Sequence, residues 1–84
     1  MKVVIYTTPI CPYCIIIKNY LKKNNISFEE IDVLKDEKKG AEMAKKSNQE
    51  NVPVTEVDGK IIVGYDLKKL KEALGIEWAL YHQL

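Results

Sequence analysis

Cys11 and Cys14 are separated by two residues and are the only cysteines of the chain. They follow a short apolar, β-branched run at residues 3–6 and precede a helical pattern that begins near Pro12. Two thiols that share the first turn of a helix can interconvert between dithiol and disulfide with little backbone movement. The spacing therefore predicts a redox-active pair.

The start of the helix predicts different roles for the two sulfurs. Its first backbone N–H groups have no intrahelical partner, and the aligned peptide dipoles add partial positive charge there. This environment favours the thiolate of Cys11, whereas apolar neighbours one turn deeper favour the thiol of Cys14. Pro12 suits the first turn because its missing N–H is not needed there. We expect Cys11 to attack a substrate and Cys14 to resolve the mixed disulfide.

Three other uses of the two cysteines remain open: a structural disulfide, a zinc site and an inert core pair. A strand–CxxC–helix context in a chain with no further cysteine disfavours a structural disulfide. Zinc needs about four ligands, and the chain offers only these cysteines and the distant His82. We therefore expect no metal.

Composition indicates one small globular domain spanning residues 1–84. The chain is 46% hydrophobic and 30% charged, its net charge is +1, and all 13 basic residues are lysine. Nothing in this balance calls for nucleic acid or an acidic membrane surface. The sequence shows no secretory signal and no apolar run near the ~18–20 residues of a membrane span. We expect a cytoplasmic monomer.

Periodicity and turn signals predict an α/β domain of order β-α-β-α-β-β-α. The strands are expected at residues 2–6, 27–32, 54–57 and 60–63. The helices are expected at 12–24, up to about residue 47 after an N-cap at Asp36, and at 67–74 after an N-cap at Asp66. A right-handed crossover makes the first two strands parallel, and Asp58-Gly59 makes the last two an antiparallel hairpin. Helices should cover both faces of the sheet. The apolar tail at residues 76–84 is expected to pack on the domain.

Three motifs, Cys11-Pro12-Tyr13-Cys14, Val52-Pro53 and Gly64-Tyr65-Asp66, resemble those of the glutaredoxins, and of short bacterial glutaredoxin-like proteins in particular. The resemblance covers about residues 1–75. It implies a thioredoxin fold with a four-stranded mixed sheet and a cis Val52–Pro53 bond. It also implies a groove for glutathione or another thiol substrate, lined by Tyr13, Val52, Pro53, Gly64 and Asp66.

The match departs from the family at positions that hold glutathione's charged ends. Thr8 stands at a common lysine position, and Leu67 replaces the second of two acidic residues. Asn51 and Val63 replace a common threonine and glycine. Each missing charge-assisted contact weakens binding by roughly 1.5–3 kcal/mol. Glutathione affinity is therefore in question, whereas thiol chemistry is not.

Ile10, Ile15 and Ile16, which we call the apolar collar, flank the cysteines where the family often carries polar side chains. We favour an interpretation in which Ile16 and Ile17 belong to the core and the tail bearing Trp78 covers the rest. The alternative is a docking surface for a protein disulfide or a reductase. Lys18 is expected to be solvated, and Tyr65 to pack rather than bind ligand.

The resemblance favours a dithiol thiol–disulfide oxidoreductase. It would have no tightly bound cofactor, use glutathione as co-substrate and act on disulfide-containing proteins. A second hypothesis is an electron donor to a dedicated enzyme, reduced by a thioredoxin-reductase-type flavoprotein. A third is an iron–sulfur carrier that bridges two chains through Cys11 and glutathione, against which Pro12 argues.

Overall fold

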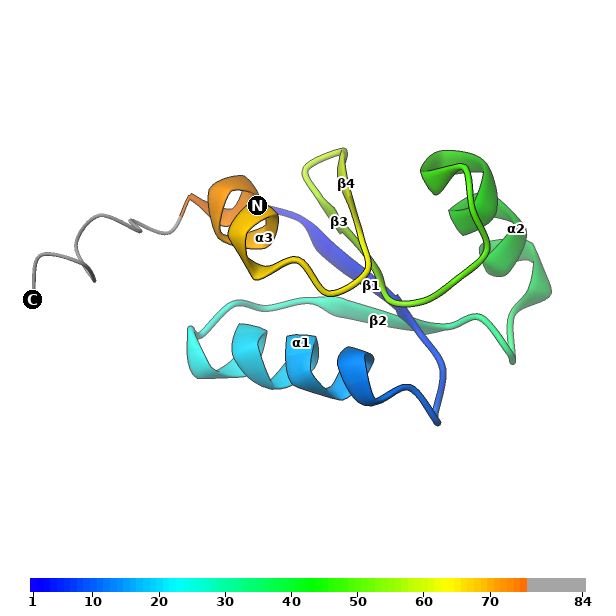
Figure 1. Ribbon diagram of the computed structural model, residues 1–84, viewed down its shortest axis with the longest axis horizontal. Coiled ribbons are helices and arrows are strands. Elements are labelled where there is room, and N and C mark those ends of the chain that lie inside the picture. Colours follow the sequence, from blue (N-terminus) through cyan, green and yellow to red (C-terminus); the bar gives the residue numbers. More distant parts are fainter. Residues whose placement is uncertain (76–84) are drawn as a thin grey trace, which may run out of the picture.

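The computed structural model describes residues 1–75, so the expected packing of the tail at residues 76–84 lies outside the described residues. The element order β-α-β-α-β-β-α is confirmed (Figure 1). The elements are β1 Val3–Thr7, α1 Pro12–Lys23, β2 Glu29–Asp32, α2 Glu37–Ser47, β3 Val54–Val57, β4 Lys60–Val63 and α3 Leu67–Leu74.

The strands form one four-stranded mixed sheet in the order β2-β1-β3-β4. β1 runs parallel to β2 and antiparallel to β3, and β3 runs antiparallel to β4, as expected. The carboxyl ends of β1 and β4 and the amino end of β3 therefore meet at one edge of the sheet. That edge carries all three segments that the sequence singled out.

β1 is buried along its whole length because both faces of the sheet are covered. Val3 and Ile5 pack in a core with side chains of α1 and α3, whereas Val4 and Tyr6 pack with Met43 of α2. Figure 1 shows α1 and α2 on opposite sides of β1. α1, which carries the CxxC motif, therefore packs on the face of the sheet opposite α2.

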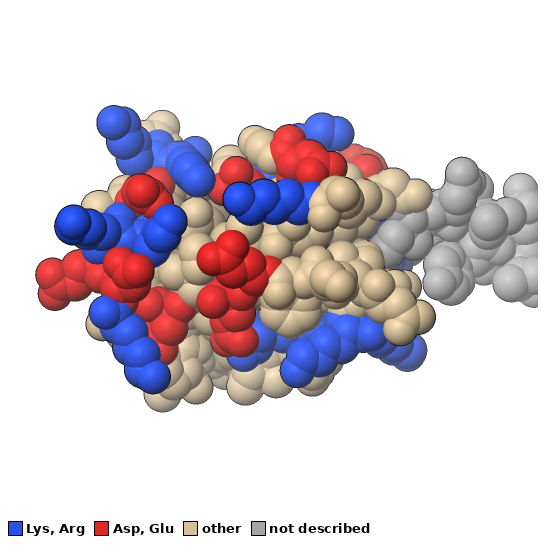
Figure 2. All heavy atoms as spheres, turned by 180° about the vertical axis from the view of Figure 1, so that it is seen from behind, with Lys and Arg blue, Asp and Glu red and all other residues tan. Residues whose placement is uncertain are grey.

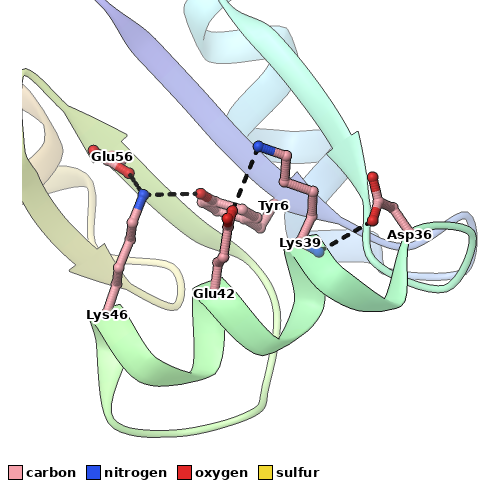
Figure 3. Close-up of polar contacts among 6 residues, drawn as sticks. All are labelled: Tyr6, Asp36, Lys39, Glu42, Lys46 and Glu56. Carbon is pink, nitrogen blue, oxygen red and sulfur yellow. Dashed lines mark hydrogen bonds and ion pairs between the residues drawn. The ribbon is translucent and has the colours of Figure 1, made fainter.

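Polar contacts fix α2 on the other face (Figure 3). Lys46 Nζ lies 3.4 Å from the Tyr6 hydroxyl and 3.0 Å from Glu56 Oε1. The hydrogen bond with Glu56, assisted by that with Tyr6, raises the pKa of Lys46. Asp36 caps the helix by accepting a hydrogen bond from the Lys39 N–H at 3.1 Å. The two contacts of Lys46 join α2 to β1 and β3, and neither involves the cysteines.

Element boundaries differ from the sequence-based expectation by one or two residues. β1 is shifted by one residue because Thr7 pairs with Asp32 and is buried, while Lys2 is exposed. β2 starts at Glu29 rather than at residue 27, since its ladder with β1 begins at Val4 and Glu29. α1 ends at Lys23, one residue early, whereas α2 begins after its predicted cap Asp36 and ends at Ser47 as expected.

The described surface mixes charges of both signs. Figure 2 shows lysines interspersed with acidic side chains on the face that it presents. Among residues 1–75 no helix is long and apolar enough to cross a membrane.

Candidate active site

Cys11 is the N-cap of α1. Its backbone is extended, at φ −102° and ψ 107°, and Pro12 follows in the first turn. This conformation directs its Sγ back over the helix start, where it accepts a hydrogen bond from the Cys14 N–H at 3.2 Å. The positive end of a backbone N–H dipole therefore faces this sulfur.

The two free thiols differ in access to solvent. Cys11 keeps 9% of its surface exposed and Cys14 none. Burial raises the pKa of the Cys14 thiol, and its hydrogen bond with Cys11 acts in the same direction. Hydrogen bonds with the Thr7 side chain and the Thr8 backbone oppose this shift. Both cysteines are thus buried, and only Cys11 keeps a small exposed fraction.

Thr7 is a site residue that the sequence analysis missed. The strand was expected to end at residue 6, before Thr7, yet the buried Thr7 side chain forms a hydrogen bond with Cys14. Its place directly after a buried run and four residues before Cys11 was the available signal. Position alone could not show toward which face its hydroxyl turns.

The Val52-Pro53 and Gly64-Tyr65-Asp66 segments meet beside the cysteine loop. The Val52–Pro53 bond is cis, as predicted. The Gly64 N–H donates a hydrogen bond to the Pro53 carbonyl at 2.8 Å, which ties the two segments together. Gly64 adopts φ +75°, a conformation that L side chains rarely adopt. Val52 is half-buried against the Val4–Tyr6 core, and Pro53 is buried.

Tyr13 and Tyr65 form an exposed ring pair that we call the aromatic stack. Their centroids lie 5.4 Å apart with an interplanar angle of 17°. The two side chains remain 55% and 47% exposed. Tyr65 packs, as expected, but on an exposed partner beside the CxxC motif. The stack joins α1 to the β4–α3 connection.

Asp66 serves as the predicted cap of α3. Its Oδ1 accepts a hydrogen bond from the Lys69 N–H at 3.1 Å, and its residue is half-buried. One carboxylate oxygen is therefore committed to the helix start. The expected role of Asp66 toward a thiol ligand would therefore depend on its other carboxylate oxygen or on the negative charge of the carboxylate.

The favoured interpretation of the apolar collar was wrong for Ile16. Ile17 is 1% exposed and belongs to the core, but Ile16 is 41% exposed. The buried residues of α1 are Cys14, Ile17 and Leu21, a spacing that leaves Ile16 on the outer face. Ile10 and Ile15 are 85% and 49% exposed. Their expected covering by the tail concerns residues outside those described.

Lys18 is not a solvated lysine. Its Nζ lies 2.7 Å from Glu30 Oε2, and its side chain is 22% exposed.

Within residues 1–75 no group of three or more His, Cys, Asp or Glu side chains is arranged to hold a metal ion.

A family model described as Glutaredoxin matches residues 3–62. The chain belongs to the glutaredoxin family. It is 43% identical over 70 residues to the uncharacterized glutaredoxin-like 8.6 kDa protein in the rubredoxin operon of Clostridium pasteurianum. That alignment covers 83% of this chain and 93% of the relative. Glutaredoxin 3 of Escherichia coli K12 is 38% identical over 65 residues, covering 77% and 78% of the two chains.

Among solved structures, a mutant of the thioredoxin-like protein BC3987 superimposes with a TM-score of 0.85 at 36% identity. The match covers 90% of this chain and 97% of that protein. The expected thioredoxin fold is therefore confirmed. This glutaredoxin-like chain is a redox protein, and its family carries thiol–disulfide oxidoreductase activity.

Proposed function

We propose that the protein is a dithiol glutaredoxin, in which Cys11 is the nucleophile and Cys14 the resolving thiol. The Cys14 N–H, 3.2 Å from Cys11 Sγ, carries this proposal, since a backbone donor faces the sulfur of the one cysteine that keeps an exposed fraction. The raised pKa of Cys14 keeps that thiol protonated and prevents it from competing for the substrate.

In the first step the Cys11 thiolate attacks one sulfur of a substrate disulfide. The substrate S–S bond breaks, and the departing thiolate takes a proton from water. In the second step Cys14 loses its proton and attacks Cys11 Sγ. The mixed disulfide breaks, a second substrate thiol leaves, and a Cys11–Cys14 disulfide remains. Two electrons have passed from the protein to the substrate.

We assign the thiol-compound groove to Tyr13, Val52, Pro53, Gly64 and Asp66. The hydrogen bond between Gly64 and Pro53 supports this assignment, because it brings two of these segments together. The backbone groups of Val52 would pair with the peptide part of the ligand, and the Asp66 carboxylate would attract its ammonium. We propose glutathione as the co-substrate, no tightly bound cofactor, and a reducing cytoplasm as the compartment.

A second candidate is an electron donor that a flavoprotein reductase reduces and that serves one partner enzyme. The ion pair of Lys18 with Glu30 and the threonine at position 8 favour it, because both leave glutathione's carboxylates with fewer cations near the cysteines. The glutaredoxin-like relative named for a rubredoxin operon is compatible with a role in electron transfer.

The oxidised protein distinguishes these candidates. It is mixed with reduced glutathione in one reaction and with NADPH and a thioredoxin reductase in another, and free thiols are counted over time. Faster reduction by glutathione supports the dithiol glutaredoxin. Reduction by the flavoprotein alone would assign the second function. A Cys14→Ser control, which cannot form the internal disulfide, should consume no NADPH.

A further inference from the structure

We propose that Gln49 is a positioning residue of the candidate active site. Its side-chain amide holds the main chain of Asn51 and thereby fixes the direction in which the next residue, Val52, presents its backbone to a disulfide substrate. This inference rests on the proposed role of Val52 in the groove, and it adds a residue that the groove assignment does not include.

The connection from α2 to β3 carries the hydrogen bonds in question (Figure 1). It begins at Asn48, the C-cap of α2, whose φ of +60° lies in the left-handed region. Residues 48–52 belong to neither a helix nor a strand. Because no helix or sheet ladder orders the backbone of such a segment, side chains have to supply part of its hydrogen bonding.

The side chain of Gln49 supplies three hydrogen bonds. Its Oε1 accepts from the Asn51 N–H at 2.7 Å, and its Nε2 donates to the Asn51 carbonyl oxygen at 3.0 Å. Nε2 also donates to Ser47 Oγ at 3.0 Å. Because an amide nitrogen carries two hydrogens, it can make both bonds at once. Both backbone polar groups of Asn51 are therefore held by one side chain.

Ser47 connects this amide to α2. Ser47 Oγ lies 2.7 Å from the carbonyl oxygen of Met43, one turn earlier in the helix, and 3.0 Å from that of Gln49. Met43 is 2% exposed and belongs to the hydrophobic core. Gln49 thus ties Asn51 to a helical turn that the core keeps in place.

The bond from Gln49 to the Asn51 carbonyl sets the direction of the Val52 N–H. A trans peptide unit is planar, so the carbonyl of one residue and the N–H of the next lie in one rigid plane and point in opposite directions. The Asn51–Val52 bond is trans, since the cis bond of this segment is the one between Val52 and Pro53. Holding the Asn51 oxygen therefore orients the donor that follows it.

The residues on both sides of Val52 are held in this way. Asn51 is bonded to Gln49 before it, and after it the Pro53 carbonyl accepts a hydrogen bond from the Gly64 N–H at 2.8 Å. None of these bonds uses the N–H or the carbonyl of Val52, the groups that the proposed groove offers to a ligand. Loss of the Gln49 amide should therefore impair pairing with peptide groups and leave the reactivity of the cysteines unchanged.

The test compares two neutral disulfides. One is the disulfide dimer of glycyl-cysteinyl-glycine with acetylated and amidated ends, which offers peptide groups without charge. The other is hydroxyethyl disulfide, which has no peptide group. Each is mixed in excess with the fully reduced protein, and the loss of protein thiols gives a second-order rate constant. The ratio of the two constants, which we call the peptide preference, cancels any effect of a variant on the cysteines or on the folded fraction.

Gln49→Met keeps the length of the side chain but lacks the amide. We expect it to lower the peptide preference about fivefold, equivalent to about 1 kcal/mol. Gln49→Glu keeps an acceptor for the Asn51 N–H but has no donor for the Asn51 carbonyl at neutral pH, so it should lower the preference as well. Asp36→Ala removes a hydrogen bond at the other end of α2 and should retain the wild-type preference.

Amide hydrogen exchange reports on the hydrogen bond itself. The Asn51 N–H should exchange slowly in the wild-type protein and faster in Gln49→Met, which lacks its acceptor. A Gln49→Met protein that loses this protection but keeps the wild-type peptide preference would overturn the inference, because the side chain would then only stabilise the loop. If Gln49→Met does not fold, a wild-type preference in Gln49→Glu would overturn it. A wild-type protein inert toward both disulfides would instead overturn the dithiol function.

Discussion

The Cys14 backbone N–H donates a hydrogen bond to Cys11 Sγ across 3.2 Å, so the main chain of one cysteine directly contacts the sulfur of the other. The donor belongs to the main chain and does not depend on the Cys14 side chain. A substitution at position 14 can therefore remove the Cys14 thiol without removing this hydrogen bond to Cys11 Sγ.

The first prediction concerns the roles of the two sulfurs. Cys14→Ser should accumulate a stable mixed disulfide with glutathione after exposure to oxidised glutathione, because Cys11 keeps its hydrogen bond and nothing resolves the adduct. Cys11→Ser should form none, since Cys14 is fully buried. Intact-protein mass spectrometry measures the adduct. Equal trapping by the two variants would show that the assignment of roles is wrong.

The second prediction is that resolution accelerates with pH. Burial and the hydrogen bond with Cys11 raise the pKa of Cys14, so little of it is thiolate at neutral pH. Its thiolate fraction, and hence the resolving rate, should grow about tenfold for each pH unit below that pKa. The mixed disulfide is formed in acid, the pH is raised rapidly, and the release of glutathione is followed. A rate that does not change with pH would contradict the prediction.

The third prediction links the same group to stability. The folded state holds the Cys14 proton more tightly than the unfolded state does, because its folded pKa is raised. The associated stability is fully present below the ordinary pKa of the thiol and is lost as pH rises through the folded value. Urea unfolding of the reduced protein should show this alkaline decline. Cys14→Ser should lack that component, and an identical decline in the variant would assign it to other groups.

The fourth prediction contrasts two neighbouring isoleucines of α1. Ile17→Ala should lower the free energy of unfolding by about 2–5 kcal/mol, because it opens a cavity under the CxxC helix. Ile16→Ala should cost less than about 1 kcal/mol, since Ile16 is 41% exposed. Chemical denaturation measures both. Similar losses for the two variants would contradict this prediction.

Local patterns were sufficient for the fold because each strand and helix carries its own signal. Asp66 precedes an apolar helix pattern and Asp58-Gly59 separates two β-branched runs, so caps and hairpin follow from neighbouring residues alone. The boundary of β1 did not follow in this way. Whether Thr7 belongs to the strand depends on Asp32, its partner in β2.

The site was predictable only where its chemistry is local. Cys11 and Cys14 share one turn, so their spacing indicated their relationship. The aromatic stack joins Tyr13 to Tyr65, and no pattern in either segment announces the other. Their contact follows from the strand order, which brings the ends of β1 and β4 to one edge. Ile16 is the opposite case. Its apolar side chain suggested burial, but its position in the helix places it on the outer face.

The fifth prediction separates the two roles assigned to Asp66. Asp66→Ala removes the cap of α3 and should cost about 1 kcal/mol of stability, as should Asp36→Ala at the equivalent cap of α2. Asp66→Asn keeps a capping oxygen but loses the charge, so it should retain stability and weaken glutathione-dependent turnover through a higher KM. Asp36→Ala, which lies outside the proposed groove, should leave KM unchanged. An Asp66→Asn protein with a wild-type KM would restrict this carboxylate to its role as a cap.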